Sequence, residues 1–320
     1  MTSRSQPGLL RTVTGSVPVH AVTGTVLPHE HLQLDLRWPQ RGLAAVPSDP
    51  RRWLDEEQAV TAELSGLRAE HELSLVVDLT CQGMGRNAAM LSRISAGARV
   101  AVVAGTGFFT EPFHPQFVGT ADEDLLTERI MTEIEFGMDG TSSLPGVIGE
   151  IGSWGAVPTT AEERCLRAAA RAGLESGLSV ATYGRAGLTL LEILTSAGLP
   201  AERVAVGQLD LVDDAGAHRK IAEMGAYVSF GSLGLAGQDA AALGARVRHV
   251  LELLEAGHGD RVLLSTGISR MTQIKRYGGS GYGYLMDVFV PALRAAGVDE
   301  AALRTILHDN PLRWLTGTAG

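Results

Sequence analysis

Short apolar segments alternate with longer amphipathic segments along most of the chain. The apolar segments are continuous, which is typical of parallel strands that are buried on both faces. The predicted strands are Val22–Leu27, Leu73–Leu79, Arg99–Ala104, Gly146–Ile151, Leu178–Thr182, Arg203–Val206, Ala226–Phe230 and Arg261–Leu264. Between them the clearest helix patterns are Thr160–Glu175, Leu188–Ala197 and Asp239–Ala256.

This alternation predicts an α/β fold. Eight strand–helix units over about 300 residues match the size of a (β/α)8 TIM barrel. A doubly wound open sheet is the alternative, but the phosphate-binding pattern G-x-G-x-x-G is absent after the first strand. No linker or shift in composition divides the chain, so we expect a single domain over residues 1–320. Arg37–Arg52 and Arg270–Tyr284 are predicted to be loops on the catalytic face of the barrel.

Composition and charge exclude several classes of protein. The chain has 320 residues, 45% of them hydrophobic, and a net charge of −9. The negative charge argues against binding to nucleic acid or to an anionic membrane surface. Two cysteines are too few for a disulfide framework, no apolar stretch is long enough to span a membrane, and the first residues lack a secretory-signal pattern. We therefore expect a cytoplasmic protein with a small-molecule substrate, and a homodimer is compatible with the sequence.

Candidate metal ligands lie at the ends of two predicted strands. His29 and His31 follow the first strand, and residues two apart on a strand point to the same side. At the mouth of a barrel, both imidazoles can converge on one metal ion. Glu150 lies in the apolar fourth strand, where burying a carboxylate is costly unless it is paired or ligated. Each feature alone has a structural explanation, but their combination favours a functional site.

The chain resembles the phosphotriesterase-like family of the amidohydrolase superfamily over essentially its whole length. The resemblance is carried by LPHEHL (27–32), VDLTCQGMGRN (77–87), VAGTGFF and FHP (103–109, 113–115), GVIGEIG (146–152), TTAEERCLRAAARA (159–172), RVAVGQLD (203–210), RVLLSTGISR (261–270), YGGSGYGY (277–284) and DNPLRWL (309–315). The family is a TIM barrel whose mouth usually holds two divalent metals. The ligands are His-x-His on strand 1, a bridging carbamylated Lys or Glu on strand 4, His on strands 5 and 6, and Asp on strand 8.

Half of that ligand set matches this chain. His29 and His31 fall on the His-x-His, and Glu150 falls on the bridging position. The other three positions hold Tyr183, Gln208 and Gly267. The resemblance therefore implies at most one divalent ion, zinc-like, at His29, His31 and Glu150. A two-metal centre is not expected, and a metal-free site remains the alternative.

Three functional interpretations follow from this partial match. The first is hydrolysis of a small ester, lactone or amide-like compound at a mononuclear or metal-free site. The second is a metal-independent isomerase, cyclase or lyase, and the third is an inactive binding protein on the same barrel. The predicted catalytic residues are His31, Glu150, Tyr183 and Gln208, and the predicted substrate-binding residues are Arg86, Phe109, Arg270 and Tyr282. Histidines such as His218 and His249 show no clustering and are predicted to be surface or helix residues.

Overall fold

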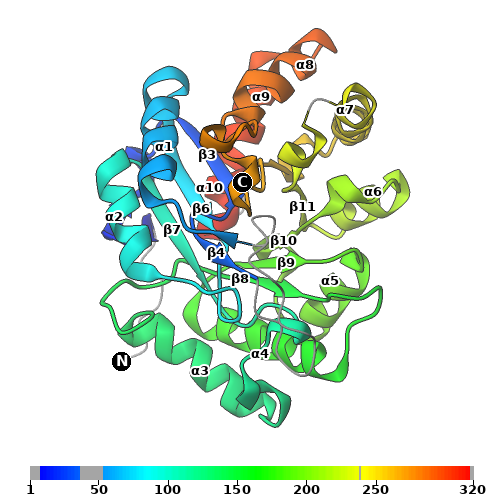
Figure 1. Ribbon diagram of the computed structural model, residues 1–320. Helices are drawn as coiled ribbons and strands as arrows, with labels where there is room; N and C mark the ends of the chain where they lie inside the picture. The colour runs from blue at the N-terminus through cyan, green and yellow to red at the C-terminus, as the bar shows by residue number, and fades with distance from the viewer. Residues whose placement is uncertain (1–7, 37–52, 238, 318–320) are drawn as a thin grey trace.

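Eight parallel strands form the centre of the molecule (Figure 1). The computed structural model describes residues 8–36, 53–237 and 239–317. In sheet order the strands are β12 (Val262–Leu264), β11 (Tyr227–Phe230), β10 (Val204–Val206), β9 (Val180–Tyr183), β8 (Val147–Gly152), β7 (Ala101–Thr106), β6 (Leu73–Asp78) and β3 (Thr25–Glu30). Neighbours in the sheet are also neighbours in chain order, and helices surround them. The structure therefore confirms the predicted (β/α)8 barrel.

Helices cover the outside of the strands (Figure 1). They are α1 (Glu57–His71), α2 (Ala88–Ala98), α3 (Glu123–Phe136), α4 (Thr160–Ser176), α5 (Gly187–Ser196), α6 (Ala215–Glu223), α7 (Ala240–Glu255), α8 (Val290–Ala295), α9 (Glu300–Arg304) and α10 (Asn310–Thr316). The three helices predicted from the sequence correspond to α4, α5 and α7. The start of α4 is fixed by a capping box between Thr159 and Glu162. No helix in the described ranges is long and apolar enough to cross a membrane.

The first barrel strand begins and ends three residues later than the apolar pattern predicts. The observed strand β3 is Thr25–Glu30, whereas the pattern of apolar residues gives Val22–Leu27. His29 and Glu30 are polar, so the pattern excludes them, yet both are buried within the strand. The candidate ligand His29 therefore lies on the barrel wall itself and not in a loop.

The amino-terminal end of the barrel is closed by elements that the sequence analysis did not predict. A hairpin of β1 (Leu9–Thr12) and β2 (Gly15–Pro18) precedes the barrel. Leu10 of this hairpin and Trp314 of α10 pack into one apolar cluster with the barrel residues Val26 and Leu75. This packing fills the barrel floor and leaves the opposite end for a site.

The seam between the last and first strands is joined by the side chain of Glu30. Its carboxylate accepts hydrogen bonds from Ser265 Oγ (2.8 Å), Thr266 N (2.7 Å) and Ile268 N (2.8 Å). In addition, His29 N donates to Ser265 Oγ and His31 N donates to the carbonyl of Ile268. The buried Glu30 carboxylate thus fixes the His29–His31 segment against the loop that follows β12.

Of the two loops predicted on the catalytic face, the structure describes the one after β12. The segment after β12 is irregular as expected, with short 3-10 turns at Met271–Gln273 and Lys275–Tyr277. Arg37–Arg52 lies outside the described residues. The strand before this stretch, β4 (Leu34–Asp35), pairs with the strand after it, β5 (Trp53–Leu54), in a small two-stranded sheet.

Candidate functional site

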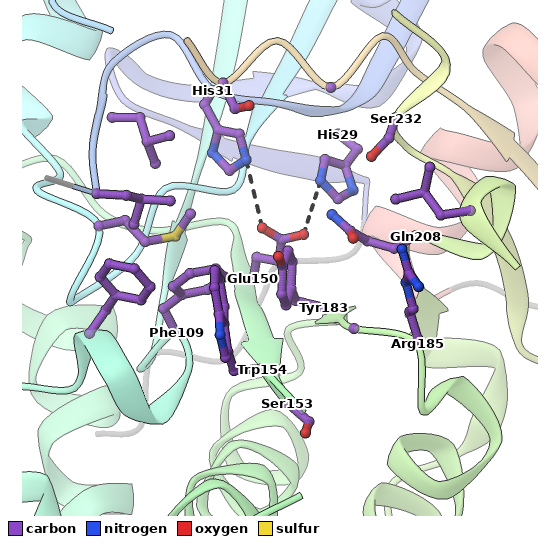
Figure 2. A pocket seen from close by; sticks show the side chains of 18 of the residues that line it. His29, His31, Phe109, Glu150, Ser153, Trp154, Tyr183, Arg185, Gln208 and Ser232 are labelled. Carbon is purple, nitrogen blue, oxygen red and sulfur yellow. Dashed lines mark ion pairs between the residues drawn. The ribbon is translucent and has the colours of Figure 1, made fainter. Parts of the chain in front are cut away.

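A pocket of about 730 Å³ is formed mainly by residues at and beyond the carboxyl ends of the barrel strands (Figure 2). Residues of β3, β8 and β9 contribute, together with the loops that follow several strands. Its lining is His29, His31, Leu34, Leu36, Met84, Phe109, Phe113, Glu150, Ser153, Trp154, Gly155, Ala156, Tyr183, Gly184, Arg185, Gln208, Leu211, Ser232, Leu235, Gly267, Ser269 and Arg270. The location is the one at which TIM barrels carry their active sites.

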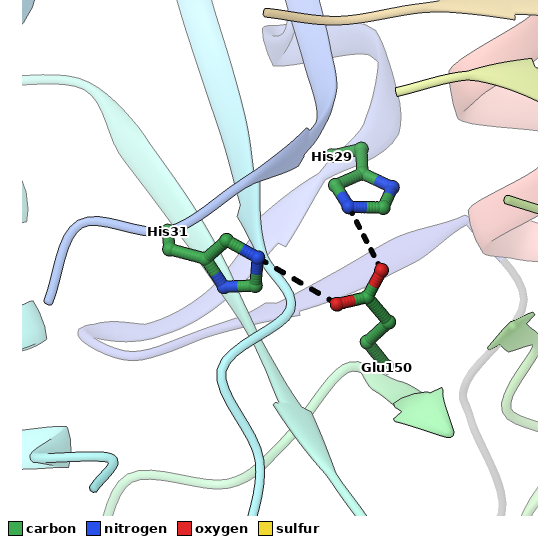
Figure 3. A group of neighbouring side chains, drawn as sticks. All are labelled: His29, His31 and Glu150. Atoms are coloured by element: carbon green, nitrogen blue, oxygen red, sulfur yellow. Dashed lines mark ion pairs between the residues drawn. The ribbon is translucent and has the colours of Figure 1, made fainter. Parts of the chain in front are cut away.

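His29, His31 and Glu150 converge in this pocket (Figure 3). Glu150 Oε1 lies 3.1 Å from His29 Nε2, and Glu150 Oε2 lies 3.6 Å from His31 Nε2. All three side chains are buried, and their ligand atoms lie within 4.8 Å of one another. In the described part of the chain, this is the group of acidic, histidine or cysteine side chains that could hold a metal ion.

The hydrogen bonds of His31 define its tautomer. Thr80 Oγ1 donates its proton to the carbonyl of Gln33, so it accepts from His31 Nδ1 at 3.0 Å. His31 Nδ1 therefore carries the proton, and the lone pair of Nε2 points toward Glu150. Burial and the neighbouring His29 lower the pKa of His31 to about 3, which keeps the ring neutral. A second partner that fixes the tautomer in this way is usual for metal-binding histidines.

The donor atoms fit one divalent cation. His31 Nε2 and Glu150 Oε2 are both acceptors, so at 3.6 Å they cannot form a hydrogen bond with each other. Glu150 Oε1 is buried and has no hydrogen bond of acceptable geometry, although His29 Nε2 is 3.1 Å away. Two nitrogens and a carboxylate facing a shared centre suit a zinc-like ion with open coordination positions.

His29 differs from His31 in its electrostatic surroundings. Burial disfavours a charged ring, but the attraction of the nearby Glu150 carboxylate, with weaker attraction from Glu30 and Asp210, raises the pKa of His29 overall. The centre between the two histidines and Glu150 therefore favours positive charge.

Tyr183 lies beside this centre and remains a phenol at neutral pH. Burial and the Glu150 carboxylate raise the pKa of Tyr183 to about 12, while Arg185 and Arg270 oppose the shift. A tyrosine binds a metal only as phenolate, so this environment favours Tyr183 as a hydrogen-bond donor. Gln208 also lines the pocket, as the residue that precedes a short 3-10 turn.

The backbone at Gly267 leaves no room for a side chain. Its φ is +66°, and a Cβ atom placed there would lie 2.1 Å from the carbonyl oxygen of Gly231. The position that the sequence resemblance assigns to a strand-8 aspartate is therefore occupied by backbone alone.

The predicted substrate-binding residues divide into two groups. Phe109 and Arg270 line the pocket, and the Phe109 ring meets Tyr183 edge-on at 4.8 Å. Tyr282 is fully buried outside the lining, and its hydroxyl donates to the carbonyl of His31 at 2.7 Å. Tyr282 thus supports the histidine segment rather than facing the pocket.

The expectation that Arg86 faces a substrate anion requires correction. Its guanidinium forms ion pairs with Glu133 at 2.6 Å and Asp139 at 2.7 Å, and its side chain is 2% exposed. A third bond reaches the carbonyl of Gly105. Arg86 is therefore neutralised inside the structure and joins the loop after β6 to α3.

Sequence reasoning missed pocket residues in the loops after β8 and β9. Trp154 stacks on Tyr183 with ring centres 6.3 Å apart, and Phe113 meets Trp154 at 5.4 Å. Arg185 also reaches the pocket. A signal was available, because Trp154 follows the Gly149-Glu150 segment closely and Arg185 follows Tyr183 by two residues.

The prediction that His218 and His249 are unclustered surface or helix residues is partly wrong. Both lie in helices, α6 and α7, but both are buried and their ring centres are 5.0 Å apart. His249 Nε2 lies 3.0 Å from the Asp213 carboxylate, and both rings pack against Phe230. Because the two histidines are far apart in the sequence, the sequence alone does not predict that they meet between the two helices. Neither histidine lines the pocket described above.

Comparison with known proteins gives consistent matches over nearly the whole chain. Residues 8–315 match the model of the Phosphotriesterase family. The "Phosphotriesterase homology protein" of Escherichia coli is 33% identical over 292 residues, which cover 90% of this chain and 97% of that protein. Human "N-acetyltaurine hydrolase" is 29% identical over 351 residues, covering 98% of this chain and 99% of the human one. A lactonase of Listeria monocytogenes superposes with a TM-score of 0.86 at 26% identity, covering 97% of this chain and 100% of the lactonase.

Proposed function

The chain belongs to the phosphotriesterase family, and from this premise we propose that it hydrolyses a small amide or ester at a site with one metal ion. The observation that carries the proposal is the facing pair of acceptors, His31 Nε2 and Glu150 Oε2, in a buried centre that His29 completes. A cation between these atoms would satisfy all of them together. The names of relatives support a carbonyl substrate, since N-acetyltaurine contains an amide and a lactone is a cyclic ester.

A divalent ion held by His29, His31 and Glu150 would polarise a carbonyl oxygen and lower the pKa of water. Side chains of the protein would stabilise and orient the substrate. Tyr183, kept protonated, donates a hydrogen bond to the oxygen on which negative charge develops. Phe109 and Trp154 form an apolar wall beside Tyr183. Gln208 offers an amide for orienting the substrate within the same pocket.

Hydrolysis is tested by tracing oxygen from water into the product. With a panel of N-acyl amines, simple esters and lactones, the protein is expected to convert at least one member and to place one ¹⁸O atom from labelled water in the acid formed. Boiled protein and unlabelled water are the controls. Conversion of a substrate without ¹⁸O incorporation would replace hydrolysis by an isomerisation, cyclisation or elimination.

Replacing Tyr183 with phenylalanine is expected to lower kcat by about 10²–10³-fold, the usual effect of removing one donor to a developing oxyanion. Metal content and melting temperature should hardly change, because the Tyr183 hydroxyl forms no hydrogen bond that the fold needs among the described residues. Tyr277→Phe is the matched control, since that hydroxyl is exposed and bonds to Glu56. Full activity of the Tyr183→Phe variant would show that the tyrosine only fills space.

A further inference from the structure

Two arginines line the pocket. Arg185 follows β9 and is exposed, and Arg270 follows β12 and is half-buried; both line the pocket. Within the described ranges neither guanidinium forms an ion pair, in contrast to Arg86 with its two carboxylates. Two cations without an ion-pair partner in the described part of the chain, at the lip of a pocket, are available to a ligand.

The charge of the pocket is opposite to that of the chain. The protein carries a net charge of −9, yet Glu150 is the single carboxylate among the lining residues described. That carboxylate lies against the two histidines, with Oε1 at 3.1 Å from His29 Nε2 and Oε2 at 3.6 Å from His31 Nε2. The positive charge of Arg185 and Arg270 also reaches the Tyr183 phenol, where both oppose the rise of its pKa. The side of the pocket near Tyr183 is therefore cationic in an acidic protein, which would attract anions toward it.

The apolar and cationic parts of the pocket are separated. Figure 2 shows Phe109 and Trp154 on one side of Glu150, with Arg185 and Gln208 on the other. A bound molecule whose carbonyl lies over Glu150 would therefore place one end against aromatic rings and the other near the Arg185 guanidinium. This arrangement distinguishes the two ends of the molecule.

We propose that Arg185 and Arg270 form an anion subsite, and that the substrate is an amide or ester whose far end carries a carboxylate or sulfonate. Guanidinium groups bind such planar or multi-oxygen anions through paired, charge-assisted hydrogen bonds. The acyl part packs on Phe109 and Trp154, and the anionic end fixes the scissile carbonyl between Tyr183 and the His29–His31–Glu150 centre. This inference rests on the proposed hydrolase function and extends it to the substrate class.

The test compares a charged substrate with its neutral counterpart. N-acetyl-β-alanine and its primary amide have the same length, and the anionic form is expected to be hydrolysed with the higher kcat/KM. In an Arg185→Gln/Arg270→Gln double variant, kcat/KM for the anionic form should fall by about 10–100-fold, mainly through KM, because charge-assisted bonds are lost. The neutral form should change by less than about threefold. Arg304→Gln, which removes an exposed arginine on α9 outside the pocket, is the control.

Binding of butane-1-sulfonate and butan-1-ol, measured by calorimetry, separates this inference from the proposed hydrolysis. The sulfonate is expected to bind the wild type and to bind the double variant more weakly. The affinity of the alcohol should be the same for both proteins. If no amide is hydrolysed but this pattern is observed, the subsite stands and the hydrolase proposal fails. Equal hydrolysis of both N-acetyl compounds by wild type and double variant would overturn the subsite, as would sulfonate binding that the double variant retains.

Discussion

Replacing Glu150 with glutamine is expected to lower kcat/KM by at least about 10³-fold, because it removes the negative charge that would hold the proposed cation between His29 and His31. The amide has nearly the same size, so the buried space around it is preserved. An amide oxygen is a poor partner for an ion that prefers imidazole and carboxylate. Elemental analysis should accordingly find one equivalent of divalent metal in the wild type and little in the variant.

Glu175→Gln provides the matched control, because Glu175 is exposed on α4 and lies outside the pocket. That variant should keep both its metal and its activity. Two tightly held metal equivalents in the wild type would contradict the single-ion site. A Glu150→Gln variant that retained full activity would contradict the role of the carboxylate altogether.

Replacing Glu30 with alanine is expected to lower the free energy of unfolding by roughly 3–5 kcal/mol, because buried donors lose their charged acceptor. The backbone N–H groups of Thr266 and Ile268 and the hydroxyl of Ser265 all donate to this carboxylate. Each would be left unpaired in the closed seam between β12 and β3. Urea unfolding of chelator-treated protein measures the change without a contribution from bound metal.

Glu30→Gln is the informative companion variant. Its amide oxygen can still accept one or two of these hydrogen bonds, although its NH₂ group must face other donors. The free energy of unfolding should therefore fall less than it does for the alanine variant. Glu63→Ala is a suitable control, since Glu63 accepts from loop N–H groups of Lys275 and Tyr282 at a less buried place. Equal stability of Glu30→Ala and the wild type would show that the seam does not depend on this side chain.

The periodicity of the sequence predicts the fold well because the barrel strands are buried on both faces. Runs such as Leu73–Leu79 are continuous and apolar, and the structure places β6 at Leu73–Asp78. The apolar pattern fails where polar residues are buried. His29 and Glu30, at the end of β3, are such residues. Apolar periodicity cannot assign such residues to a strand.

The site is less predictable than the fold, because its contacts join distant parts of the chain. The sequence marks the His29–His31 pair directly after an apolar strand and Glu150 within another, and the structure brings them together. Arg86 was given a binding role because its motif lies after a strand, but the loop turns its guanidinium toward Glu133. Trp154 and Arg185 belong to loops with no periodic pattern; their closeness in sequence to Glu150 and Tyr183 is the available signal, and the folded chain shows that they line the pocket.

The conformation of Gly267 limits how the full ligand set implied by the sequence resemblance could be introduced into this chain. At φ +66°, an aspartate there would force its Cβ to 2.1 Å from the carbonyl of Gly231. Introducing histidines at positions 183 and 208 is a matter of side chains, whereas an aspartate at position 267 depends on the backbone of a neighbouring loop. The order of substitutions is therefore constrained by epistasis: the segment around Gly231 must shift before an aspartate at 267 becomes tolerable. Directed evolution toward a second metal should begin with libraries in that segment.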